Sequence, residues 1–191
     1  MTGPWRHGAA GAVLALGLIG AAGLKARAAD PPQADLVVRF EERLGADRFF
    51  IENTGTCLAV VMAVTIDLRG TGGGLVFDTV AGGGGVGTAY PFLPLEGADK
   101  LAGAGGGSDG GHVLSLDLTG LSQGERVVIS IDVDEERPDG GGGLTQIFGR
   151  QFENGTVTAT IRAPDGVEQT HTGRFDGNGW AFVNPRTCAV S

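Results

Sequence analysis

Short runs of β-branched and apolar residues, separated by clusters of glycine, constrain the fold of this chain most strongly. In Thr65–Leu68 and Ser115–Leu118, apolar and polar residues alternate with a period of two, as in a strand with one solvated face. No segment of ten or more residues after residue 28 shows the 3.6-residue apolar period of an amphipathic helix. We therefore expect an all-β domain.

Segments with strand composition recur along the chain after a Pro31-Pro32 spacer, each bounded by turn-forming residues. The expected strands are Leu36–Glu41, Arg48–Asn53, Cys57–Leu68, Leu75–Thr79, Val113–Leu118, Arg126–Val133, Leu144–Gln151, Thr156–Ala163, Val167–Gly173 and Trp180–Val183. Asn154-Gly155 has the composition of a two-residue hairpin turn, and Pro164–Gly166 and Asp176–Gly179 repeat such turn chemistry. The C-terminal strands are therefore expected to form an antiparallel meander within one sheet.

Glycine is concentrated in four clusters, Gly70–Gly74, Gly82–Gly85, Gly103–Gly111 and Gly140–Gly143. Such segments offer no side chains to bury and lose much entropy on ordering, so exposed, mobile loops between strands are expected. Two packed sheets with long glycine-rich loops at their ends give an antiparallel β-sandwich, immunoglobulin-like or jelly-roll-like. A closed barrel is the alternative.

The N-terminal residues 1–28 have the pattern of a secretory signal peptide. A short basic segment precedes the apolar run Gly8–Leu24, and the Ala-Arg-Ala triplet that ends at Ala28 has the small-x-small form of a cleavage site. The apolar run is shorter than the ~20 residues that a bilayer span needs. Cleavage between Ala28 and Ala29 would export the rest of the chain, to the periplasm or beyond the cell. An uncleaved membrane anchor is the alternative.

Residues 29–191 are expected to form one domain, which is large enough to bury a core and has a strongly acidic composition. Three of the 14 basic residues lie in the first 28 residues and all 22 acidic residues lie after them, so the domain carries 11 basic residues and a net charge of −11. This balance disfavours nucleic acid and anionic membrane surfaces as partners, and suits cations, basic partners or simple solubility. Cys57 and Cys188 are expected to form a disulfide in an oxidising compartment, with two buried thiols or an intermolecular bridge as alternatives.

The main candidate for chemistry is the acidic segment that begins at Asp132. Asp132 and Asp134 project to the same face of a strand, and Glu135, Glu136 and Asp139 follow where the strand gives way to a loop. Carboxylate oxygens gathered beside a flexible loop are suitable ligands for Ca²⁺, whereas the bland alternative is a solvated acidic face. Three further aspartates are candidates to complete the site: Asp78, Asp109 and Asp117.

Other motifs give no support for an enzyme. Gly106–Gly110 matches the G-x-S-x-G pattern of a hydrolase nucleophile elbow around Ser108. That elbow requires a following helix, and the sequence does not predict one. Trp180 is expected in the core, with a surface position as the alternative. Core positions are also expected for most phenylalanines, namely Phe40, Phe49, Phe50, Phe77, Phe148, Phe152, Phe175 and Phe182.

Four blocks of the sequence resemble a known family of exported proteins. These blocks are Phe49–Cys57, Val64–Leu68, Gly74–Thr79 and Val128–Asp134. Read together, they resemble small exported bacterial proteins of the aggregation factor core family, over about residues 36–136. The resemblance implies a β-sandwich and a calcium-dependent adhesive role, and it transfers no catalytic residues.

We therefore expect an exported, non-enzymatic adhesion or interaction module with a protein or glycan partner, and with no membrane span once the signal is removed. A structural or accessory periplasmic domain without a ligand is the first alternative. A hydrolase built on a β scaffold is the second.

Overall fold

A computed structural model describes residues 35–43, 47–55, 59–103, 105–136 and 146–184. The chain divides into two units, Met1–Pro31 and Pro32–Ser191, and every described residue belongs to the second. The signal peptide, its Ala28–Ala29 cleavage site, the Cys57–Cys188 pair and Asp139 lie outside the described residues, so these stay predictions. Within the described ranges, no helix is long and apolar enough to cross a membrane.

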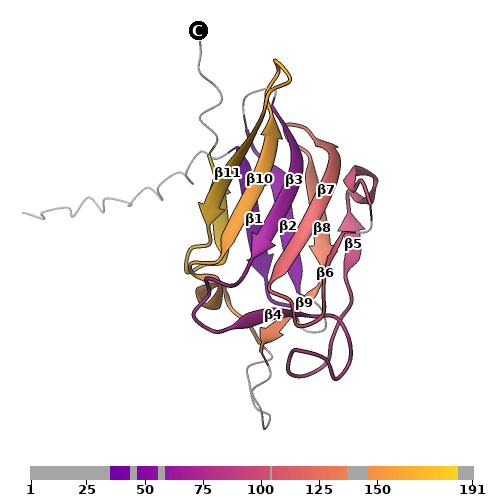
Figure 1. Cartoon of the computed structure of the whole chain (residues 1–191), viewed down its shortest axis with the longest axis vertical. Helices are drawn as coiled ribbons and strands as arrows, with labels where there is room; N and C mark the ends of the chain where they lie inside the picture. The colour runs from indigo at the N-terminus through magenta and orange to yellow at the C-terminus, as the bar shows by residue number, and fades with distance from the viewer. Residues whose placement is uncertain (1–34, 44–46, 56–58, 104, 137–145, 185–191) are drawn as a thin grey trace, which may run out of the picture. The chain divides into compact units, whose positions relative to one another are not determined.

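Two five-stranded antiparallel sheets form the two layers of the domain, which confirms the predicted all-β class (Figure 1). Sheet A has the order β12 (Trp180–Val183), β1 (Leu36–Glu41), β2 (Arg48–Asn53), β8 (Arg126–Ser130) and β5 (Leu93–Glu96). Sheet B has the order β11 (Glu168–Arg174), β10 (Thr156–Arg162), β3 (Val60–Asp67), β7 (Val113–Leu121) and β6 (Gly106–Gly107). A small sheet C pairs β4 (Leu75–Asp78) with β9 (Asp132–Glu135). The described strands are consistent with a β-sandwich and do not close into a barrel.

The core lies between sheets A and B because each strand alternates buried and outward residues. In β1, Leu36, Val38 and Phe40 are buried while the residues between them are only half-buried. Phe152 packs on Phe40 and Phe49, with ring centroids 4.1 and 5.8 Å apart, so aromatic contacts join distant parts of the chain. Such contacts add to the stabilisation from apolar burial.

Four aromatic residues expected in the core lie on outward positions instead. Phe50 and Phe182 are half-buried, whereas Trp180 and Phe148 are exposed. For Phe50, Phe182 and Trp180 the reason is register: their neighbours in sequence occupy the inward positions of β2 and β12, and a period of two then turns these rings outward.

The predicted strands are largely confirmed, and among the differences the short β6 lies in a glycine cluster that was expected to be a loop. The expected strand Leu144–Gln151 is wrong where it is described, since a 3₁₀ helix, η2, spans Gly149–Phe152 and Phe148 N donates to Gln151 Oε1. The expected strand Arg126–Val133 is interrupted at Ile131, so β8 joins sheet A and β9 joins sheet C. Strand β5 was not predicted because it contains Pro94; as an edge strand it tolerates a missing N–H donor. A second 3₁₀ helix, η1 (Ala98–Lys100), follows β5.

The expected C-terminal meander is wrong, because β12 leaves the sheet of its neighbours. Strands β10 and β11 form a hairpin in sheet B, but β12 pairs with β1 in sheet A. At the crossing, Asp176 Oδ1 accepts the N–H groups of Asn178 and Trp180, at 2.8 and 3.1 Å. Asn154 does adopt a positive φ of 73°, but it follows η2 and not a strand, so its turn is not a β-hairpin.

Two glycine clusters pack against each other, contrary to the expected exposed loops. A Cβ on Gly84 would lie 2.3 Å from Gly110 Cα, and a Cβ on Gly85 would lie 2.6 Å from Asp78 Cβ. Only glycine allows backbone segments to approach this closely. The loop that contains Gly82–Gly85 therefore packs against Gly110 and against Asp78 of sheet C. The Gly140–Gly143 cluster lies outside the described residues.

Candidate metal-binding site

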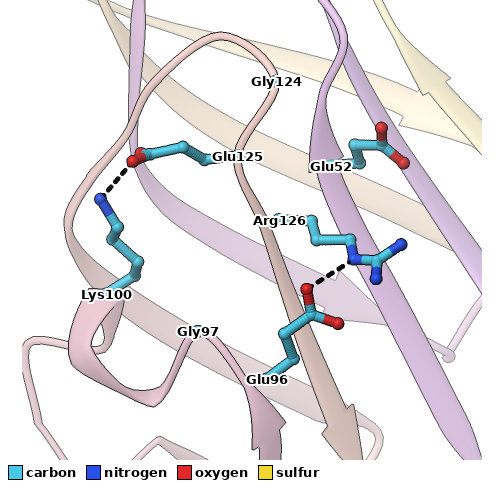
Figure 2. Close-up of a pocket in the computed structure, with 7 residues that line it drawn as sticks. All are labelled: Glu52, Glu96, Gly97, Lys100, Gly124, Glu125 and Arg126. Carbon is cyan, nitrogen blue, oxygen red and sulfur yellow. Dashed lines mark hydrogen bonds and ion pairs between the residues drawn. The ribbon is translucent and has the colours of Figure 1, made fainter.

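One group of charged side chains lines an open cavity of about 420 Å³ at the edge of sheet A (Figure 2). Lys100 Nζ lies 2.6 Å from Glu125 Oε1, and Arg126 Nε lies 2.8 Å from Glu96 Oε1. The pKa of Glu125 lies below its usual value because Lys100 hydrogen-bonds to it, and Arg126 has the same effect on Glu96. Most charges in this cavity are thus compensated by a neighbour.

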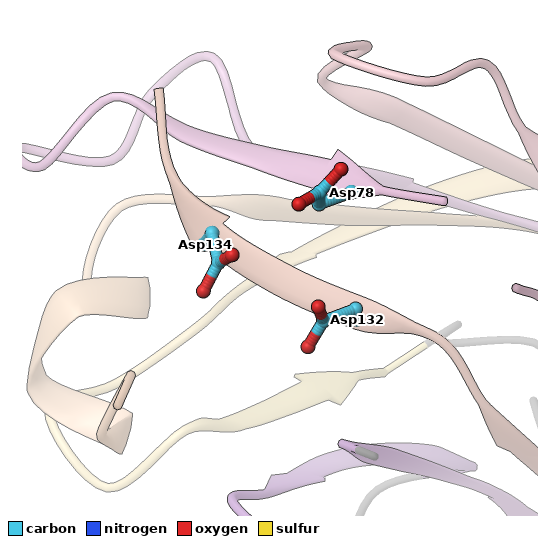
Figure 3. Close-up of side chains that lie close together, drawn as sticks. All are labelled: Asp78, Asp132 and Asp134. Carbon is cyan, nitrogen blue, oxygen red and sulfur yellow. The ribbon is translucent and has the colours of Figure 1, made fainter. Parts of the chain in front are cut away.

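A second group consists of acidic residues only and is buried (Figure 3). Asp78, Asp132 and Asp134 are 1%, 9% and 2% exposed, and one carboxylate oxygen from each lies within 4.8 Å of the others. We call these three residues the aspartate trio. Neither the cavity of Figure 2 nor a second one of about 470 Å³ beside Arg150 is lined by the trio.

The register of sheet C brings the trio together. Asp78 at the end of β4 lies directly opposite Asp132 at the start of β9. Asp134 follows Asp132 by two residues, so a strand period of two places it on the same face. A short antiparallel pair thus gathers carboxylates from segments that are distant in the sequence.

Asp109 holds the loop that packs against Asp78 of the trio. Its Oδ1 accepts the N–H groups of Thr79 and Val80, both at 2.9 Å, and its Oδ2 accepts that of Gly84 at 3.0 Å. These bonds, with the Thr79 N–H first, keep the pKa of Asp109 below its usual value. The same loop places Gly85 against Asp78. Asp109 also hydrogen-bonds to the Asp78 side chain, so this predicted candidate contacts the trio although it is not one of its three members.

Burial and mutual repulsion perturb the trio strongly. Desolvation, followed by the negative charges of Asp78 and Glu42, raises the pKa of Asp132 to about 7. Desolvation, followed by the charge of Asp132, raises the pKa of Asp134 to about 7 as well. Asp134 Oδ2 is buried and has no hydrogen-bond partner among the described residues. Near neutral pH, this arrangement favours either a bound proton or a bound cation.

Asp47, which directly precedes β2, binds the strand that carries two members of the trio, and it was not predicted from the sequence. It is buried, and its Oδ2 accepts the N–H of Val133, which lies between two members of the trio, at 3.1 Å. Burial, followed by the charge of Glu42, raises the pKa of Asp47 far above its usual value. In a sequence, an aspartate before a strand looks like any other acidic residue in a loop. No sequence pattern therefore distinguishes Asp47.

The structure brings together only part of the predicted calcium site. Asp132 and Asp134 share a face as predicted, and Asp78 completes the trio. Glu135 lies on the opposite face of β9, and Glu136 is exposed beyond the strand, where its N–H donates to Gly74 O at 2.8 Å. Asp117, another candidate, is exposed on β7.

No family model, curated protein or solved structure matches this chain. The interpretation of the trio therefore depends on its own geometry and chemistry.

Proposed function

We propose that this domain is a non-enzymatic, calcium-binding β-sandwich module that acts in adhesion outside the cytoplasm. The observation that carries the proposal is the buried aspartate trio, with three carboxylates within 4.8 Å of one another. An acidic cluster alone would be insufficient, since solvated acidic faces are common. The buried Asp134 Oδ2, without a hydrogen-bond partner among the described residues, is the second observation that favours a ligand.

The donor set selects the class of ligand. All three side chains offer carboxylate oxygens, which suit hard cations such as Ca²⁺ and Mg²⁺ rather than metals that prefer nitrogen or sulfur. A divalent cation would offset the repulsion that raises the pKa values of Asp132 and Asp134. Ca²⁺ is favoured over Mg²⁺ because it accepts flexible geometry and mono- or bidentate carboxylates, whereas Mg²⁺ demands a near-ideal octahedron.

A general acid in a hydrolase would also benefit from a raised pKa, so the enzyme alternative needs a physical answer. The trio is at least nine-tenths buried, and glycine backbone packs closely against Asp78. Three carboxylates can supply up to six of the six to eight oxygen ligands that Ca²⁺ takes without an open pocket, whereas a substrate needs such a pocket beside the acid. We therefore favour the binding role over the catalytic one.

The adhesive part of the proposal depends on the resemblance to the aggregation factor core family and on the predicted signal peptide. Export would place the domain where calcium is abundant enough for the weak affinities of extracellular modules, about 10⁻⁴–10⁻³ M.

Two measurements on the full chain test the proposal. Isothermal titration with CaCl₂ at pH 7.5 is expected to show binding in the range of about 10⁻⁴–10⁻³ M, with weaker or no binding of MgCl₂. Beads coated with the protein are expected to cluster in calcium and to disperse in excess EGTA. Absence of calcium binding would overturn the whole proposal, whereas binding without bead clustering would overturn its adhesive part only.

A further inference from the structure

The outer face of sheet A carries an unusual row of aromatic and cationic side chains. In register, Arg39 of β1 lies opposite Trp180 of β12 on one side and opposite Phe50 of β2 on the other. The Arg39 guanidinium carbon lies 3.9 Å from the Phe50 ring centroid and 5.5 Å from that of Trp180. Phe182 stacks beside Trp180, with centroids 6.0 Å apart and planes 21° apart. We call these four residues the aromatic row.

A hydrogen bond to the backbone and an ion pair hold the aromatic row in place. Trp180 follows the turn in which Asp176 Oδ1 accepts its N–H, and Arg39 is fixed by an ion pair with Glu41. A cation between two rings also restrains both of them. Trp180 nevertheless remains 36% exposed, so part of this side chain meets solvent where a ligand can reach it.

The aromatic row continues into polar groups across the same face. Val37 lies opposite Phe182 and Glu52, and Glu52 lies opposite Arg126 on β8. Glu52 and Arg126 line the cavity of Figure 2, where acidic and basic side chains alternate. The face thus combines ring surfaces at one end with carboxylate and guanidinium groups at the other.

These features point to one kind of partner. The apolar area is small, because Trp180 alone among the rings of the row is exposed while Phe50 and Phe182 are half-buried. A stable protein interface needs about 800 Å² from each partner and an apolar centre. The charges largely compensate one another in pairs, so a strongly charged partner gains little. A neutral sugar meets both conditions, since its C–H face stacks on an aromatic ring and its hydroxyls hydrogen-bond to carboxylates and guanidinium groups.

We propose that the outer face of sheet A, centred on Trp180, binds a neutral glycan. This inference rests on the proposed adhesive function and adds a glycan ligand beside the calcium-dependent contact, but it uses no residue of the aspartate trio. Glycan binding is therefore expected to persist in excess EGTA, so failure of the calcium site and failure of the glycan site are separate results.

Affinity electrophoresis of the full chain tests the glycan site. Native gels containing dextran, mannan, xylan or hydroxyethyl cellulose serve as probes, and at least one is expected to retard the protein. The Trp180→Ala variant is expected to lose about tenfold or more in affinity, and Trp180→Phe to retain part of it. Phe148→Ala is the matched control, because Phe148 is also exposed and lies 5.5 Å from an arginine, Arg150, but outside the aromatic row.

Trp180 itself supplies a second readout, since the sequence has two tryptophans and Trp5→Phe leaves Trp180 as the single emitter. A retarding polysaccharide is expected to change its fluorescence. The proposal is overturned if none of the four probes retards the protein or changes the fluorescence, or if Trp180→Ala and Phe148→Ala bind alike. Self-association that requires Trp180, measured by sedimentation velocity, would also overturn it and would make this face a contact between copies of the chain.

Discussion

Strands β7 and β9 both alternate polar and apolar residues, yet the carboxylates that they carry have opposite environments. In β7, Asp117 is exposed between the buried Leu116 and Leu118. In β9, Asp132 and Asp134 are buried on one face while Val133 is buried on the other. The difference arises from what covers each strand. The outer face of β7 in sheet B meets solvent, whereas a glycine-rich loop and Asp47 form a cover beside β9. Alternation decides which residues share a face, and the surrounding loops decide whether that face meets water.

The largest effect is expected from breaking that cover. Gly84→Ala would bring a Cβ to 2.3 Å from Gly110 Cα, whereas Gly72→Ala, with no atom within 4 Å, is the matched control. Overpacking of this kind costs about 2–3 kcal/mol, so the melting temperature of Gly84→Ala is expected to fall by about 5–10 °C. Thermal unfolding followed by circular dichroism measures both variants. Equal melting of the two would show that the loops do not pack as described.

The second effect is the stabilisation of the aspartate trio by calcium. Calcium at ten- to a hundredfold excess over its Kd is expected to stabilise the wild type by about 1–3 kcal/mol, or about 3–8 °C. The double variant Asp132→Asn/Asp134→Asn is expected to melt at the same temperature with calcium and with EGTA. Asp117→Asn, the equivalent change on β7, is expected to keep the full calcium effect. A calcium response that survives in the double variant would contradict the site.

The third effect is a pH dependence of the calcium-free domain. The pKa values of Asp132 and Asp134 are raised to about 7, from 3.8 for an ordinary aspartate. The folded state therefore holds protons that the unfolded chain releases, and stability is lost as the pH rises from about 4 through about 7. In EGTA, the melting temperature of the wild type is expected to fall by several degrees between pH 5 and pH 8.

The double variant Asp132→Asn/Asp134→Asn is the control for this pH effect, since it removes both titrating groups and leaves Asp47 in place. Its melting temperature is expected to change less over the same range. Parallel curves for the two proteins would assign the pH dependence to other residues.

The smallest effect is expected from Glu136, which follows β9 in the same acidic segment as Asp132 and Asp134. Glu136 has the same strand parity as Asp132 and Asp134, but it is exposed. Glu136→Gln is expected to change stability by less than about 0.5 kcal/mol and to leave the calcium response intact. Titration calorimetry measures the calcium affinity of this variant. A fall of about tenfold would contradict the expectation that Glu136 takes no part in the site.

Local patterns predicted most strands and part of the site, whereas long-range pairing could not be predicted. The bounds of β1, β2 and β12 follow from alternation between turn residues, and the shared face of Asp132 and Asp134 follows from a period of two. The choice of Asp78 over other aspartates depends on the pairing of β4 with β9, which no local pattern encodes. The outward position of Trp180 likewise depends on β12 crossing to the edge of sheet A.

The single residue between β8 and β9 has a mechanical consequence. Ser130 ends β8 in sheet A, Asp132 begins β9 in sheet C, and Ile131 between them is fully buried, with its N–H donating to Asp47 O at 3.2 Å. Tension applied along β8 therefore reaches Asp132 with no slack segment to absorb it. A cation held between β4 and β9 would cross-link the two strands along this line of force and would therefore raise the force needed to pull them apart.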